Sequence, residues 1–270
     1  MAAQQETRNM ALFCDFENIA LGVRDARYEK FDINRVLERL LLKGSIVVKK
    51  AYCDWERYKE FKSVMHGASF ELIEIPHLRQ SGKNSADIRM VVDALDLSYT
   101  KSHVDTFVII SGDSGFSPLV SKLRENAKTV IGIGVKNSTS DLLISNCDEF
   151  IYYDDLVRED EAKRRAAKKR RETRPAGGTK EAAPSDDKKQ EAFDLVIETL
   201  QALTAERGEG ERIWGSMVKQ ALKRRKPGFN ESYYGFSSFS KLLDEAESRH
   251  LLQLERDEKS GGYIVRSVSH

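Results

Sequence analysis

The sequence over residues 9–157 predicts an α/β fold, a doubly wound and mostly parallel sheet. Apolar runs of strand length recur at 10–14, 46–52, 70–75, 106–111, 129–134 and 150–153. Helical patterns separate most of these runs, and strands that alternate with helices favour a parallel sheet covered on both faces. The fourth run, TFVIIS, is apolar on successive residues, which is typical of a central strand buried on both sides.

Three stretches between the predicted strands carry apolar residues at helical spacing. They are Val36, Leu37, Leu40 and Leu41; Ile88, Val91, Val92 and Leu95; and Leu119, Val120 and Leu123. Each stretch predicts a helix whose apolar face packs on the sheet. In the second helix, expected from about Ser85 to Tyr99, Arg89 and Asp93 are four residues apart and are expected to pair.

The composition is that of a folded protein, with 40% hydrophobic and 32% charged residues and a net charge of +1. Cys14, Cys53 and Cys147 form no CxxC pair, so neither a zinc knuckle nor a disulfide framework is indicated. The polar N-terminus lacks the apolar core of a signal peptide, and no apolar run approaches the ~20 residues that span a bilayer. We therefore expect a soluble, cytoplasmic protein without a membrane partner.

A change in composition divides the chain. Residues 158–190 contain no large apolar residue, and their first part, 158–174, holds nine Lys or Arg against four Asp or Glu. Such a segment predicts a basic, flexible linker, which acts either as a tether or as an arm that touches phosphates. The expected organisation is one domain over 9–157, this linker, and a second domain over 191–270.

The second domain has the pattern of a winged helix. Amphipathic helices are predicted in EAFDLVIETLQALTAE, WGSMVKQALKRRKP and SSFSKLLDEAESRHLL. Ser216 is the expected cap of the second helix and Pro227 its stop. Two short strands, LLQLE and YIVRSV, flank a polar, glycine-containing turn and form the wing.

Acidic side chains follow the ends of two predicted strands. Asp15 comes directly after the first strand, and Asp113 comes after TFVIISG. In doubly wound sheets, ligands bind at the carboxyl ends of the strands where the strand order reverses, so these side chains are expected to lie close together. Asp87, one turn into its helix on the face of Val91 and Leu95, is the third candidate.

Carboxylates at one edge repel one another unless a cation neutralises them, and Mg²⁺ or Mn²⁺ prefers such oxygen ligands. Asn18 adds a neutral oxygen beside them. Turn chemistry explains Asp15 or Asp113 taken singly, and a capping box with Asn84 explains Asp87. Taken together, the residues favour a metal site.

Four stretches, LFCDFENIA, GKNSADIRMVVDAL, VIISGDSGFSPLVSKLRE and NCDEFIYYDDL, resemble the successive motifs of NYN domains, which are PIN-like, metal-dependent ribonucleases. The resemblance covers roughly residues 9–157. It implies that the chain hydrolyses RNA phosphodiesters, with Mg²⁺ or Mn²⁺ held by Asp15, Asp87 and Asp113 and with Asn18 as a further catalytic residue. Lys83, which precedes the second acid, is expected to reach a phosphate.

One position departs from the family pattern. The family commonly has SGDSDF, whereas this sequence has SGDSGF, so Gly115 replaces an acid. The loss weakens the expected metal site, unless Asp141 or Asp148 compensates. Two alternatives to a ribonuclease therefore stay open: a catalytically weak or inactive RNA-binding adaptor, and a regulator that docks protein partners through its second domain.

Most of the tail, from GSMVKQ to LLQLE, resembles the LOTUS, or OST-HTH, domain, and Gly235, Phe236 and Phe239 carry the match. The resemblance implies RNA binding, or docking of a protein partner in some members. Core packing is the alternative explanation for Phe236 and Phe239, and we expect it to apply to at least one of them. Basic residues and two tyrosines that are expected to contact RNA cluster there, namely Lys219, Lys223, Arg224, Arg225, Lys226, Tyr233 and Tyr234.

Overall fold

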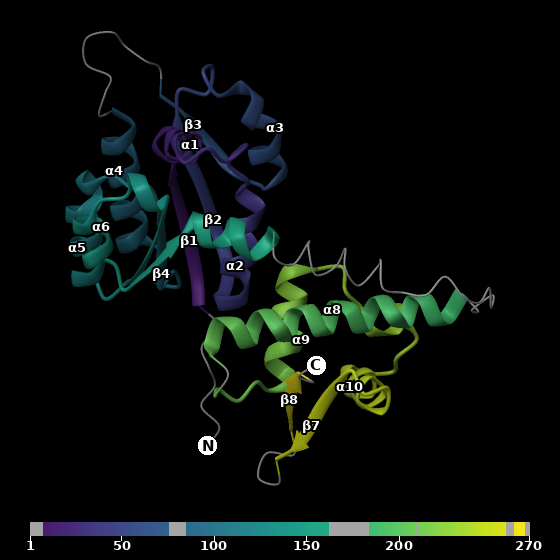
Figure 1. Cartoon of the computed structure of the whole chain (residues 1–270). Helices are drawn as coiled ribbons and strands as arrows, with labels where there is room; N and C mark the ends of the chain where they lie inside the picture. Colours follow the sequence, from purple (N-terminus) through teal and green to yellow (C-terminus); the bar gives the residue numbers. More distant parts are fainter. Residues whose placement is uncertain (1–7, 76–84, 162–183, 209, 258–261, 268–270) are drawn as a thin grey trace. The chain divides into compact units, whose positions relative to one another are not determined.

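The computed structural model describes residues 8–75, 85–161, 184–208, 210–257 and 262–267 (Figure 1). The chain divides into two compact units, one built mainly from residues 7–174 and the other mainly from residues 175–270. The central part of the predicted linker, 162–183, lies outside the described residues. Helix α8 begins at Pro184, inside the predicted linker, because proline is favoured at the first helical position and Lys188, Lys189 and Gln190 are good helix formers.

The first unit contains one parallel sheet of six strands, in the order β3-β2-β1-β4-β5-β6. The strands are β1 (Arg8–Asp15), β2 (Gly44–Cys53), β3 (Glu71–Glu74), β4 (Thr106–Ile110), β5 (Thr129–Gly134) and β6 (Glu149–Tyr152). The order reverses between β1 and β4, which are neighbours in the middle of the sheet. The predicted doubly wound α/β fold is confirmed.

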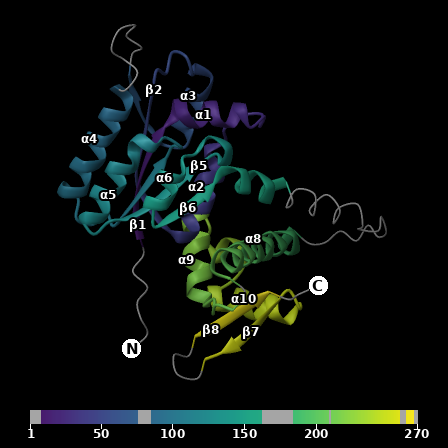
Figure 2. The ribbon, with the colours of Figure 1, turned by 60° about the vertical axis from the view of Figure 1, so that its left-hand side comes forward.

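Helices cover both faces of this sheet (Figures 1 and 2). They are α1 (Phe16–Asp25), α2 (Ile33–Lys43) and α3 (Lys59–Gly67) on one face, and α4 (Ser85–Thr100), α5 (Ser117–Glu125) and α6 (Asp141–Asn146) on the other. Strand β1 serves both cores, since Leu12 faces the first set of helices and Phe13 the second. Phe13 stacks on Phe107 of β4, with ring centroids 6.0 Å apart.

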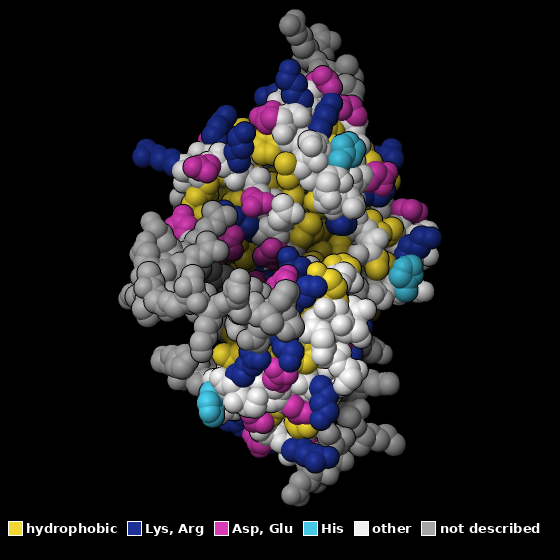
Figure 3. Space-filling model, turned by 90° about the vertical axis from the view of Figure 1, so that its right-hand side faces the viewer, with side chains coloured by type: hydrophobic (Ala, Val, Ile, Leu, Met, Phe, Trp, Pro, Cys, Tyr) yellow, Lys and Arg dark blue, Asp and Glu magenta, His cyan; other side chains and the backbone are white. Residues whose placement is uncertain are grey.

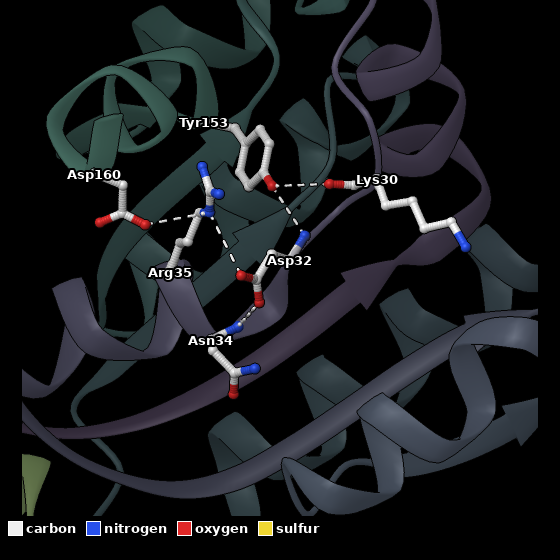
Figure 4. A network of polar contacts seen from close by, with 6 residues as sticks. All are labelled: Lys30, Asp32, Asn34, Arg35, Tyr153 and Asp160. Carbon is white, nitrogen blue, oxygen red and sulfur yellow. Dashed lines mark hydrogen bonds and ion pairs between the residues drawn. The ribbon is translucent and has the colours of Figure 1, made fainter. Parts of the chain in front are cut away.

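A polar network joins the segment after β6 to the start of α2 (Figure 4). The hydroxyl of Tyr153 accepts a hydrogen bond from the backbone N–H of Asp32 at 2.9 Å and donates one to the carbonyl of Lys30 at 3.4 Å. Arg35 pairs with Asp32 at 3.4 Å and with Asp160 at 3.3 Å. These contacts fix the last described helical segment of this unit, 153–161, against the sheet domain.

The second unit consists of α8 (Pro184–Arg207), α9 (Gly215–Arg225), α10 (Phe239–Ser248) and the antiparallel pair β7 (Leu252–Arg256) and β8 (Tyr263–Ser267). This arrangement confirms the predicted winged helix. Phe236 and Phe239 are both buried in its core, as the packing explanation requires.

The predicted cap of α9 is wrong. Trp214, not Ser216, precedes the first helical residue. Trp214 forms an isolated β-bridge with Ile264 of β8, so extended backbone continues to this point and the helix starts at Gly215. The backbone N–H of Trp214 donates to the sulfur of Met217 at 3.4 Å.

Candidate functional site

The carboxyl ends of β1 and β4 bring Asp15 and Ser111 into contact. The carboxylate of Asp15 accepts a hydrogen bond from the Ser111 hydroxyl at 3.0 Å, and only 7% of the residue is exposed. Its other oxygen accepts from the backbone N–H of Asn18 at 3.3 Å and caps α1. Asp15 therefore has a local structural role as the cap of α1, but it lies in a buried position beside a second strand.

Asn18 connects α1 to the turn after β4. Its side-chain carbonyl accepts a hydrogen bond from the backbone N–H of Gly112 at 2.8 Å. A side chain at position 112 would meet the carbonyl oxygen of Ser138 at 2.4 Å, so only glycine fits there. The turn is thus held between α1 and the loop after β5, and this turn determines where Asp113 lies.

Asp113 lies next to Asp15 through their shared contact with Ser111. The backbone N–H of Asp113 donates to the Ser111 hydroxyl at 3.2 Å. The Asp113 carboxylate accepts from the backbone N–H of Gly115 at 2.8 Å, which caps the short 3₁₀ turn that follows. Ser111 was not among the sequence candidates, although it is the first residue of the SGDSGF motif, which is the signal that could have identified it.

Asp87 and Asp113 face a common pocket of about 370 Å³. Its lining consists of Asp87, Ile88, Val91, Val92, Asp113, Gly115 and Phe116. Asp87 reaches the pocket from the first turn of α4, as its helical position predicts. Arg89 and Asp93 form the expected pair at 3.1 Å, and Asp93 also binds Lys50 and the hydroxyl of Tyr52. Asp93 therefore belongs to a separate polar cluster with Arg89, Lys50 and Tyr52.

The acids at this edge influence one another. Burial raises the pKa of Asp15 to about 7, and the charges of Asp87 and Asp113 add to this effect. The pKa of Asp87 is also raised, by burial first and then by Asp113 and Glu17. Sequence analysis assigned no role to Glu17, which forms an ion pair with Arg57 at 3.0 Å. This edge of the sheet is therefore a region of negative potential that favours a cation.

The described residues contain no group of three His, Cys, Asp or Glu side chains already arranged to ligate one metal ion. Asp15 and Asp113 instead direct carboxylate oxygens to Ser111, Asn18 and Gly115. The chemistry of the donors nevertheless fits a hard divalent cation, since carboxylates that raise one another's pKa are neutralised when such an ion binds.

Two acids, Asp141 and Asp148, were candidates to compensate for Gly115, and the structure excludes Asp148. Asp148 accepts a hydrogen bond from the backbone N–H of Val130 at 2.8 Å and pairs with Arg124 at 2.9 Å. These contacts lie near the start of β5, at the ends of the strands opposite to the candidate site. Asp148 therefore does not replace the missing acid. Asp141 is exposed in the first turn of α6.

The basic residues predicted to contact RNA differ in their surroundings. Lys219 pairs with Glu231 at 2.7 Å, and Arg225 pairs with Glu198 at 2.7 Å within the second unit. The remaining members of the cluster are Lys223 and Lys226, which are exposed, and Arg224, which follows Lys223 on α9. Lys83 lies outside the described residues. On the face drawn in Figure 3, Lys and Arg are interspersed with Asp and Glu.

The two predicted stacking tyrosines are not equivalent. Tyr233 is 61% exposed, and the ammonium group of Lys188 lies 4.7 Å from its ring centroid. Tyr234 is partly buried and stacks on Phe229, with centroids 5.4 Å apart. Tyr233 thus presents an accessible ring beside a cation, whereas Tyr234 completes the packing behind it.

Comparison with known proteins agrees with this architecture. The model of the NYN domain family matches residues 9–154, and that of the OST-HTH/LOTUS domain matches residues 191–264. Among the described residues, no helix has the length and apolar character needed to span a membrane.

Two similar proteins extend the comparison. The meiosis regulator and mRNA stability factor 1 of Xenopus tropicalis is 24% identical over 156 residues, which are 58% of this chain but only 9% of that protein. A crystal structure of a Vibrio parahaemolyticus protein of unknown function is 27% identical, with a TM-score of 0.50 over 56% of this chain and 96% of that one. Since the NYN model matches more than half of the sequence, the chain belongs to the NYN domain family, and an OST-HTH/LOTUS domain follows its NYN domain.

Proposed function

We propose that this chain is a metal-dependent ribonuclease that hydrolyses RNA phosphodiesters. Asp15, Asp87 and Asp113 would hold Mg²⁺ or Mn²⁺. The observation that carries the proposal is the meeting of these acids at the point where the strand order reverses, with the pKa of Asp15 raised to about 7. The membership of the NYN family and the printed name of the Xenopus relative, an mRNA stability factor, support RNA as the substrate.

The bound ion would polarise the phosphoryl oxygen and lower the pKa of an attacking water. The chain's own residues prepare the site for it. Ser111 orients Asp15 and, by accepting from the backbone of Asp113, fixes the spacing between the two acids. Asn18 holds the turn that carries Asp113, so its proposed role is positioning. Asp87 approaches from α4 and completes the set from a third element.

The second unit would bind the RNA that the first unit cleaves. Lys223, Lys226 and Arg224 are the proposed phosphate contacts, and Tyr233 is the proposed platform for an unpaired base. The ion pairs of Lys219 and Arg225 favour a role for these two residues in holding the winged helix together.

A specific observation favours a second candidate, an RNA-binding adaptor with little or no catalytic activity. Gly115 lines the pocket where the family commonly has an acid, and the described acids form no ready ligand set. An adaptor of this kind would keep the RNA contacts of the second unit and lose the need for the metal. A regulator that docks a protein through the LOTUS domain is the further possibility if the second unit binds no RNA.

Cleavage of mixed single-stranded and structured RNA, with Mn²⁺ or with chelator, tests the proposal. Full-length protein should cleave in Mn²⁺ and not in chelator, and Asp113→Asn should abolish cleavage. Asp96→Asn is the matched control, because it removes an exposed carboxylate from α4 that does not line the pocket. Equal cleavage by the Asp113 and Asp96 variants would reject the assignment. Binding of RNA without any cleavage would support the adaptor.

A further inference from the structure

The pocket beside Asp87 and Asp113 has an apolar wall that the proposed metal chemistry does not use. Ile88 and Val92, one turn apart on α4, are 62% and 55% exposed, although their side chains are large and apolar. Phe116 lies in the same lining and is buried. Exposed apolar side chains that are scattered singly need no explanation, but Ile88 and Val92 lie together in the lining of a pocket that also contains Asp87 and Asp113.

We propose that this wall seats one unpaired nucleobase of the RNA next to the phosphate addressed by Asp87 and Asp113. The inference rests on the proposed binding of RNA at this edge. A pocket of about 370 Å³ is at the small end of the range for organic ligands, a size suited to a single base. Aliphatic and aromatic side chains contact the face of any base.

Paired RNA cannot use this site. In an A-form duplex each base is stacked and hydrogen-bonded to its partner, so a base enters a side pocket only after it has been unpaired and unstacked. The lining residues that the structure describes also offer no side-chain hydrogen-bond donor. Such a lining distinguishes bases by size more than by their edges, and it predicts a weak sequence preference.

Photo-crosslinking of full-length protein to a short RNA that carries a single 4-thiouridine tests the inference. The single strand should crosslink to the peptide that contains residues 88–92 or to the one that contains Phe116, and the same strand in a duplex should not. The double variant Ile88→Ser/Val92→Ser should reduce this crosslink about tenfold. Val64→Ser is the control, since Val64 is 45% exposed on α3 and does not line the pocket.

Cleavage kinetics provide the second measurement. The double variant should lower kcat/KM for intact RNA about tenfold and leave unchanged that for RNA with an abasic nucleotide at the seated position. Equal crosslinking by duplex and single strand, or a crosslink that the double variant leaves intact, overturns the inference. A crosslink that depends on the pocket, without cleavage, supports the base site and rejects the ribonuclease. Metal-dependent cleavage without such a crosslink supports the ribonuclease and rejects the base site.

Discussion

Replacing Asp15 by asparagine should stabilise the metal-free protein at pH 8 while removing its proposed activity. The wild-type carboxylate is 7% exposed, and burial with nearby negative charge raises its pKa from the ordinary 3.8 to about 7. The asparagine is isosteric. Its carbonyl still accepts from the backbone of Asn18, and its amide would donate to the Ser111 hydroxyl. The substitution therefore removes a charge and keeps the contacts.

The size of the effect follows from the shift in pKa. The folded protein holds the Asp15 proton more tightly than the unfolded chain, so the stability contributed by this group is fully present below pH ~4 and is lost as the pH rises through ~7. A rise in the pKa of Asp15 from 3.8 to about 7 corresponds to about 4 kcal/mol of destabilisation once Asp15 is ionised. We expect Asp15→Asn to raise the free energy of unfolding by about 2–4 kcal/mol at pH 8, and by less than half as much at pH 5.

Urea unfolding in the presence of a chelator measures this difference, with fluorescence of Trp55, which is buried in the sheet domain, as a probe. Asp96→Asn should change the stability by no more than about 0.5 kcal/mol, as is usual for an exposed surface residue. Added Mn²⁺ should stabilise the wild type at pH 8 and leave the Asp15 variant unchanged. An unchanged or lower free energy of unfolding in Asp15→Asn at pH 8 would show that the ionised carboxylate does not destabilise the fold and would refute the reasoning.

Three further substitutions test other parts of the account. Gly115→Asp should fold, because position 115 is not among the glycines with positive φ and a new Cβ would meet only the carboxylate of Asp113, at 3.3 Å. Calorimetric titration should then show tighter Mn²⁺ binding, and an unchanged affinity would place position 115 outside the site. Lys223→Ala/Lys226→Ala should flatten the slope of log K against log salt for single-stranded RNA by about 1.4 with the melting temperature unchanged, whereas an unaltered slope would exclude both as phosphate contacts. Arg225→Ala should lower the melting temperature of the winged helix, since it breaks the pair with Glu198; a change in RNA affinity alone would contradict this structural role.

Much of the sheet domain was predictable because each strand is an apolar run bounded by polar sequence. The fifth strand agrees with its predicted range, Thr129–Gly134. The first strand is longer than its apolar run and includes Asp15, which pairs with Tyr52 of β2. A polar residue at the end of a strand continues the ladder when its neighbours in space allow it, and this information is not contained in the local sequence.

The position of the acids was predictable from topology, but their environment was not. The rule that ligands bind where the strand order reverses places Asp15 and Asp113 together, as observed. The role of Ser111 depends on its contact with Asp15, nearly a hundred positions away in the chain, and the SGDSGF motif alone does not reveal this contact. The ion pair that commits Arg225 to Glu198 is equally non-local, so sequence analysis grouped this residue with the exposed Lys223.

Calorimetric titration with Mn²⁺ tests the central claim, that three acids from three elements hold one ion, most directly. At pH 8 the full-length wild type should bind Mn²⁺, and Asp15→Asn, Asp87→Asn and Asp113→Asn should each weaken binding by at least about tenfold, because each removes a full negative charge from the ion's surroundings. Asp96→Asn, the control on α4, should bind as the wild type does. Wild-type affinity in all three site variants, or no binding by the wild type, would contradict the account.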